Sequence, residues 1–291
     1  MTKYDWTLTI RDFARAEIGL KYESIERNKK SMFRGTLYAV LSTTELFSKQ
    51  LKVYRHLLEN GFDNPYMINK VQTPGCISCL YHEILTKTRF PNQKIKRIRD
   101  LSRWWQKSDL PDRIIDDINR GRKNEFGLRT ELAKECPGLA LKASSLLFEM
   151  LGYENVIPID LWILRYLNYK GYKFPVPDYK TVSGLRDDIY LDAEKHLIEI
   201  SKEYQRQFSG HVNVTPAVFQ FALWSENAPW NLPLHHFGEQ APAIKRIRNG
   251  MTVRERAVAV SKKYVRWHDP PKPAHVLKNG ETLEDYLRSK V

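Results

Sequence analysis

Two residues of this 291-residue chain, Lys142 and Asp160, could carry covalent chemistry together. Lys142 follows the turn at Cys136-Pro137-Gly138 and lies at the expected start of a helix, where the helix dipole disfavours a positive charge. Burial in a cleft would also favour the neutral amine, which is the nucleophile that can attack a sugar C1′ and form a Schiff base. Asp160 follows the apolar run 156–159, and its carboxylate could orient the lysine and stabilise a developing cation.

Each of these residues also has an interpretation that involves no catalysis. Lys142 could be a surface lysine whose stem covers apolar neighbours and whose head binds water or phosphate. Asp160 could be an ordinary helix N-cap, a position at which aspartate is common. Only their combination, eighteen residues apart (160 minus 142) and behind a Pro-Gly turn, favours a reactive pair.

The turn before Lys142 predicts a helix-hairpin-helix motif at about residues 133–145. One helix ends near Cys136, a Pro-Gly pair turns the chain, and a second helix opens near Leu141. The backbone N–H groups at the start of such a second helix can hold a phosphate without reading any base. We therefore expect the hairpin to contact DNA through Pro137, Gly138, Leu139, Ala140 and Leu141.

The elements that must position these residues are helices, because apolar residues recur at three and four almost everywhere and strand patterns are essentially missing. The sequence predicts an all-α protein with about a dozen helices, from 2–21 to 252–264. Residues 1–229 are expected to form a core of two helical sub-domains that flank a cleft. Residues 230–291 form a basic C-terminal extension, where Lys245, Arg246 and Arg248 either extend a DNA footprint or lie on a solvated surface.

Composition indicates a polyanion as partner and argues against several other classes. Lys and Arg outnumber Asp and Glu by 47 to 34, so the formal net charge is +13 and nucleic acid is the leading candidate. No stretch approaches the ~20 apolar residues of a membrane span, and the N-terminus lacks an apolar signal core, so we expect an intracellular protein, cytoplasmic or nucleoid-associated in a prokaryote. Three cysteines do not suggest a disulfide framework, and the pair Cys76 and Cys79 lacks the further ligands of a zinc site.

Several segments together resemble one enzyme superfamily. The run Pro137-Gly138-Leu139-Ala140-Leu141-Lys142-Ala143, with Asp160 in Ile-Pro-Ile-Asp-Leu-Trp-Ile, is similar to the helix-hairpin-helix and Gly/Pro-Asp signature of base-excision DNA glycosylases. The segments 32–42 and 89–96 resemble an early helix and the approach to a central helix of that superfamily. The segment 216–229 is similar to the C-terminal helix of compact 8-oxoguanine glycosylases of archaea and some bacteria. The hairpin's usual second glycine is Ala140 in this chain.

The resemblance implies a bifunctional glycosylase and AP lyase that flips a damaged base, most often 8-oxoguanine, out of double-stranded DNA. Lys142 would attack C1′ and form a Schiff base, Asp160 would be the essential carboxylate, and β-elimination would cut an abasic site. The same chemistry on oxidised pyrimidines or mismatched bases stays open. A non-catalytic DNA-binding protein is the alternative from another class, and the Lys142–Asp160 spacing disfavours it.

The resemblance also implies further sites. Ser42 and Thr44 fall near the loop that enters the duplex, and Phe221 and Trp224 would line the base pocket, although two aromatics three residues apart are also typical of core packing. A structural monovalent cation, Na⁺ or K⁺, would bind the carbonyls of Lys134, Cys136 and Leu139. No cofactor is required, no four-cysteine motif for an iron–sulfur cluster follows the hairpin, and a monomer is expected.

Overall fold

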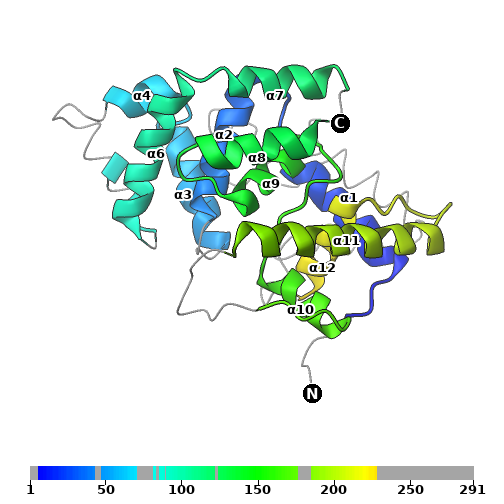
Figure 1. Cartoon of the computed structure of the whole chain (residues 1–291). Coiled ribbons are helices and arrows are strands. Elements are labelled where there is room, and N and C mark those ends of the chain that lie inside the picture. The colour runs from blue at the N-terminus through cyan, green and yellow to red at the C-terminus, as the bar shows by residue number, and fades with distance from the viewer. Residues whose placement is uncertain are drawn as a thin grey trace, which may run out of the picture.

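The computed structural model describes residues 6–42, 47–70, 81–82, 85–88, 90–121, 124–175 and 185–227. Within these ranges all regular elements are helices, which confirms the all-α prediction. Thr44, the pair Cys76 and Cys79, and the extension 230–291 lie outside the described residues. The helices are α1 (Ile10–Glu23), α2 (Lys29–Leu41), α3 (Phe47–Glu59), α4 (Pro65–Lys70), α6 (Pro91–Trp105), α7 (Leu110–Asn119), α8 (Glu125–Glu135), α9 (Leu141–Met150), α10 (Leu161–Tyr169), α11 (Asp187–Gln207) and α12 (Pro216–Asn227) (Figure 1).

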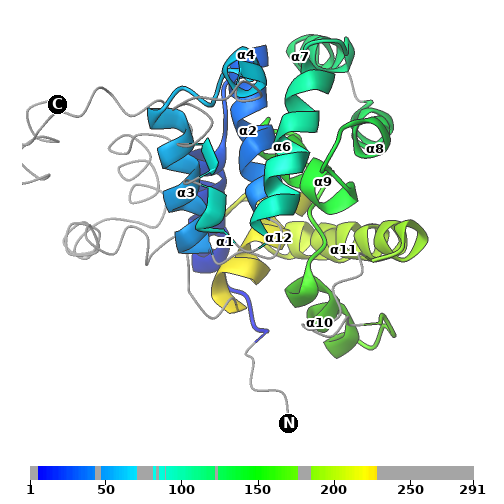
Figure 2. The same cartoon turned by 90° about the vertical axis from the view of Figure 1, so that its left-hand side faces the viewer.

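The buried apolar side chains form two clusters, as expected for two helical sub-domains. The first cluster takes residues from α2, α3, α4 and α6 to α9, and the second takes residues from α1, α10, α11 and α12 together with Leu141 at the start of α9. Figures 1 and 2 both show α10, α11 and α12 on one side of the molecule and α4, α6 and α7 on the other. The chain thus begins in the second cluster, builds the first, and returns to complete the second.

The N-terminal helix begins later than its sequence pattern indicates. The expected helix 2–21 is wrong at its start, because the described chain is extended before Ile10. The Asp12 carboxylate accepts hydrogen bonds from the Thr9 backbone N–H (2.9 Å) and the Thr9 hydroxyl (2.6 Å), which closes the helix end. Trp6 and Leu8, which precede this cap, are buried in the second cluster.

Helices α1 and α12 approach each other closely at Gly19. A Cβ atom placed at Gly19 would lie 2.3 Å from the Phe221 ring, so only glycine leaves room for this contact. The contact joins the first and last described helices within one cluster. In the described ranges, every helix is too short or too polar to span a bilayer.

Candidate active site

The hairpin lies where the sequence predicts it, between α8 and α9. Gly138 adopts φ +86°, a conformation that side chains rarely tolerate, and the Leu139 N–H donates to the Cys136 carbonyl (3.2 Å). A Cβ at Gly138 would lie 3.1 Å from the Cβ of Arg97 on α6, so glycine also permits α6 to pack against the turn. Ala140 is extended (φ −103°, ψ 179°), which any residue can adopt, so the turn does not need a second glycine.

The hairpin joins the two clusters and leaves the start of α9 without a side-chain cap. Leu139 and Ala143 pack in the first cluster, whereas Leu141 packs in the second. Ala140 is exposed and is the N-cap of α9, but its methyl group cannot accept a hydrogen bond, so α9 begins without a side-chain cap. The first N–H groups of α9 are therefore suited to an external anion.

Lys142 is the second residue of α9, and its side chain is exposed. Burial in a cleft, which would favour the neutral amine, is therefore not seen for Lys142 in this structure. Within the part of the chain that the structure describes, its ammonium has no ion-pair partner within 4.0 Å, but it acts electrostatically on Asp160. The lysine is thus close enough to influence the carboxylate and is not tied to it.

Asp160 is the N-cap of α10, as the non-catalytic interpretation predicts, but it is also coupled to Lys142. Its Oδ1 accepts hydrogen bonds from the N–H groups of Trp162 (2.9 Å) and Ile163 (3.1 Å), and its other oxygen takes no part in the cap. Burial raises the pKa of the Asp160 carboxyl above its ordinary value, while Lys142, the two N–H donors and Arg165 act in the opposite direction. Oδ1 therefore holds the Asp160 side chain at the helix start, and the carboxylate also interacts electrostatically with Lys142.

The two aromatic residues expected in the base pocket have different environments. Phe221 is 3% exposed and packs on Gly19 in the second cluster, so its ring fills the contact between α1 and α12 in this structure. Trp224 is half-buried and packs against both clusters, with its ring centroid 5.6 Å from that of Phe221. Of the two rings, Trp224 is the one with an accessible part, and the pocket role of both stays a prediction.

Two further side chains, one beside the segment before Asp160 and one at the start of α6, have functional potential that the sequence did not reveal. Gln220 on α12 donates from Nε2 to the Pro158 carbonyl (3.3 Å), two residues before Asp160, and within the described residues its buried Oε1 has no hydrogen-bond partner. Phe90 precedes α6, is 59% exposed, and has φ 54°, which is unusual for a non-glycine residue. No sequence motif marks Gln220 or Phe90, so their possible roles become visible only in the structure.

The other predicted contacts have less support from the geometry. Ser42 is the C-cap of α2, and its hydroxyl donates to the Ala39 carbonyl (2.7 Å), so it closes its own helix. The carbonyls of Lys134, Cys136 and Leu139 belong to the hairpin; that of Cys136 accepts one hydrogen bond and retains a second lone pair. Carbonyl oxygens suit a hard monovalent cation, so the backbone is compatible with this site, which stays a prediction.

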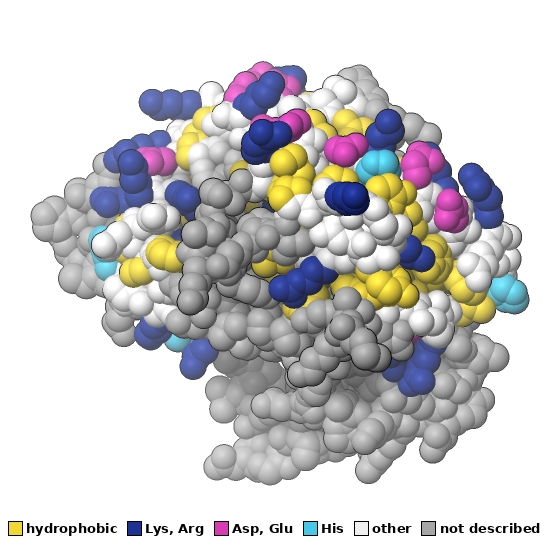
Figure 3. All heavy atoms as spheres, turned by 60° about the horizontal axis from the view of Figure 1, so that its bottom comes forward, with side chains coloured by type: hydrophobic (Ala, Val, Ile, Leu, Met, Phe, Trp, Pro, Cys, Tyr) yellow, Lys and Arg dark blue, Asp and Glu magenta, His cyan; other side chains and the backbone are white. Residues whose placement is uncertain are grey.

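The charge on one face of the molecule agrees with a polyanionic partner. Figure 3 shows a face on which Lys and Arg side chains are more frequent than acidic ones. The described residues contain no group of three or more His, Cys, Asp or Glu side chains arranged to hold a metal ion.

The fold and this site define a helix-hairpin-helix protein with a lysine and a carboxylate brought together by two helix starts. Residues 19–206, most of the chain, match the family described as 8-oxoguanine DNA glycosylase, and the chain belongs to that family. It is therefore a DNA glycosylase of base-excision repair, and DNA is its partner.

A solved structure with the same fold is the 8-oxoguanine glycosylase/lyase of Methanocaldococcus jannaschii, in complex with a 15mer DNA that contains 8-oxoguanine. The two chains are 20% identical, with a TM-score of 0.51, and the match covers 72% of this chain and 86% of the other.

Proposed function

We propose that this protein removes 8-oxoguanine from double-stranded DNA and then cuts the strand at the resulting abasic site. The observation that carries the proposal is the pair at the hairpin: an exposed Lys142 on α9 that is electrostatically coupled to a half-buried Asp160 at the N-cap of α10. One chain supplies both groups, so a monomer suffices for the reaction. The family membership and the DNA complex of the archaeal relative support the same substrate.

In the proposed reaction, the neutral Lys142 amine attacks C1′ while the bond from C1′ to N9 of the base breaks. The Asp160 carboxylate stabilises the positive charge that develops on the sugar. The Asp160 carboxylate also accepts the proton that the lysine nitrogen loses after it bonds to C1′, and its raised pKa favours this transfer. Cleavage of the C1′–O4′ bond, with a proton taken up by O4′, gives a Schiff base. Removal of a C2′ proton then breaks the C3′–O bond and expels the 3′ phosphate by β-elimination.

The DNA would dock through the uncapped start of α9 and through an exposed aromatic residue. The amides at the start of α9, from Ala140 to Lys142, would bind a backbone phosphate, which positions the strand but does not select a base. The exposed Phe90 ring lies at the start of α6, the helix whose Arg97 packs on the hairpin, and would stack on a base beside the extruded nucleotide.

Base recognition would use Gln220 and Trp224, which lie one turn apart on α12. The partly exposed Trp224 ring offers a surface for a planar base. The unsatisfied Gln220 Oε1 is a buried hydrogen-bond acceptor, and its desolvation cost would be offset by an N–H donor of the base. 8-Oxoguanine carries an N7–H donor where guanine has an acceptor.

Borohydride trapping tests this proposal. The protein is mixed with duplexes that contain 8-oxoguanine, an oxidised pyrimidine, a mismatch or an abasic site, and a reductant is added. We expect a covalent complex with the 8-oxoguanine and abasic duplexes, its loss in Lys142→Gln, and its retention in Lys134→Gln, which changes an exposed lysine on the neighbouring helix of the same hairpin.

The other outcomes contradict parts of the proposal. Trapping with a pyrimidine lesion in place of 8-oxoguanine would change the substrate. Base release by Lys142→Gln at the wild-type rate would make water the nucleophile. Binding without any base release or trapping would leave the chain a non-catalytic DNA-binding protein.

A further inference from the structure

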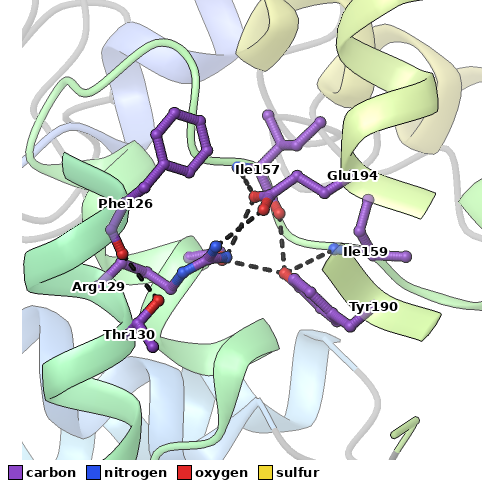
Figure 4. Close-up of polar contacts among 8 residues, drawn as sticks. Phe126, Arg129, Thr130, Ile157, Ile159, Tyr190 and Glu194 are labelled. Atoms are coloured by element: carbon purple, nitrogen blue, oxygen red, sulfur yellow. Dashed lines mark hydrogen bonds and ion pairs between the residues drawn. The ribbon is translucent and has the colours of Figure 1, made fainter. Parts of the chain in front are cut away.

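The segment that leads to Asp160 is held in place by side chains. Residues 157–159 form neither helix nor strand, so their backbone groups need partners from elsewhere. The Ile157 N–H donates to Glu194 Oε1 (3.1 Å), the Tyr190 hydroxyl donates to the Ile157 carbonyl (2.8 Å), and the Ile159 N–H donates to the Tyr190 oxygen (3.1 Å) (Figure 4). Side chains of α11 thus hydrogen-bond to both residues that flank Pro158, immediately before Asp160.

The same side chains connect this segment to the helix of Lys142. Arg129 on α8 donates to both Glu194 oxygens (3.1 and 2.8 Å) and to the Ser145 hydroxyl (2.7 Å), which lies 3.0 Å from the Tyr190 hydroxyl. Ser145 lies on α9, one turn after Lys142. The four side chains of Arg129, Ser145, Tyr190 and Glu194, here called the buried network, are at most 3% exposed.

The hydrogen bonds of the buried network have a single consistent direction. Tyr190 has one O–H, and the Ile157 carbonyl can only accept, so Tyr190 gives its proton to that carbonyl. Ser145 must then donate to the Tyr190 oxygen and accept from Arg129. Because no hydroxyl can reverse without leaving a buried group unpaired, the buried network specifies one arrangement of the segment before Asp160.

We propose that the buried network positions Asp160 relative to Lys142, with Tyr190 and Ser145 as its central positioning residues. The proposal rests on the proposed function, in which this lysine and carboxylate act together. An ion pair between α8 and α11 would by itself require only Arg129 and Glu194. The two hydroxyls add a path from the backbone beside Asp160 to the helix that carries Lys142.

The first test removes one hydroxyl from each of two buried tyrosines. Tyr190→Phe deletes the central oxygen and keeps the ring. Tyr153→Phe is the matched control, because this buried hydroxyl donates to Asp117 (3.0 Å) in the other cluster. We expect Tyr190→Phe to lower the single-turnover cleavage rate by ~10- to 100-fold with little change in DNA affinity, and Tyr153→Phe to keep the rate.

A double-mutant cycle separates positioning from a general loss of structure. If Tyr190 acts through Asp160, Tyr190→Phe lowers the residual rate of Asp160→Asn much less than it lowers the wild-type rate. Ser145→Ala, a smaller change, is expected to show the same dependence on Asp160. An equal factor in both backgrounds would overturn the proposal.

A second measurement does not depend on activity. The pKa of the Asp160 carboxyl is followed by carbon NMR of aspartate-labelled protein, in wild type and in both tyrosine variants. Burial raises this pKa and Lys142 lowers it, so loosening by Tyr190→Phe should shift the pKa, downward if burial is lost and upward if the effect of Lys142 is lost, whereas Tyr153→Phe should leave it unchanged. If the wild type cuts no DNA, the proposed function fails, and the Asp160 titration alone tests whether the buried network positions this carboxylate. An unchanged Asp160 pKa in Tyr190→Phe would refute the positioning role whether or not the protein cuts DNA.

Discussion

Replacing Gly138 by alanine should separate the stability of the hairpin from its contact with DNA. At φ +86°, alanine costs about 1–2 kcal/mol relative to glycine because its Cβ crowds the backbone. The new Cβ would also lie 3.1 Å from the Arg97 Cβ, which requires a shift of a few tenths of an ångström. We therefore expect Gly138→Ala to lower the free energy of unfolding by about 1–3 kcal/mol, measured by urea denaturation.

Gly210→Ala is the matched control for this change. Gly210 has φ +84°, and nothing lies within 4 Å of a Cβ placed there, so alanine should cost about 1–2 kcal/mol from the backbone alone. Gly210 lies after α11 and away from the hairpin in sequence.

Only the hairpin variant should lose affinity for DNA. A shifted turn moves the first amides of α9, and losing a hydrogen bond from such an amide to a phosphate costs about 1.5–3 kcal/mol, or roughly a tenfold to hundredfold rise in Kd. Fluorescence anisotropy with a labelled duplex at fixed salt measures this difference. Equal affinities of Gly138→Ala and Gly210→Ala would refute the assignment of the hairpin as a phosphate-binding element.

Three further substitutions have defined outcomes. Arg129→Met leaves Glu194 buried without its cation and should lower the free energy of unfolding in urea by ~3–5 kcal/mol. Burial already raises the pKa of Glu194, and removal of Arg129 raises it further. The loss of stability should therefore grow as pH increases through that raised pKa and shrink in acid. Asp160→Asn keeps a good N-cap and removes a charge from a half-buried site at which the carboxyl pKa is raised, so it should raise the free energy of unfolding at pH 7. The gain should be small at a pH below the ordinary carboxyl pKa, and a gain that stays constant with pH would contradict the raised pKa. Phe90→Ala should leave stability within about 0.5 kcal/mol and weaken DNA binding by about 1–3 kcal/mol in anisotropy, whereas Tyr66→Ala, an exposed aromatic on α4, should not alter binding.

Local patterns predicted most of the helices and the hairpin. The Pro-Gly pair before Leu139 marks the turn without any knowledge of the fold, and an aspartate after an apolar run marks the start of α10. The late start of α1 also has a local signal, since Thr9 and Asp12 have capping-box spacing. Periodicity alone extended that helix too far, because Trp6 and Leu8 are buried without being helical.

Long-range partners could not be predicted from one sequence. Arg129 and Glu194 are 65 residues apart, and Ser145 and Tyr190 are 45 apart, so no local pattern links them. Phe221 illustrates the same limit, because its burial depends on the absence of a side chain at Gly19 on the first helix. Lys142 and Asp160 could be singled out from the sequence only because both lie at helix starts, which have local signals.

The order in which the two clusters use the chain has a consequence for how the enzyme matures. Described residues of the first cluster span 25–156, whereas the second combines Trp6 with Leu223 and so requires nearly the whole described chain. During synthesis, the first cluster can be completed while α11 and α12 are still unmade. The segment before Asp160 then has no Glu194 or Tyr190 to hold it, so in the nascent protein Lys142 would be in place on α9 well before the Asp160 carboxylate is ordered.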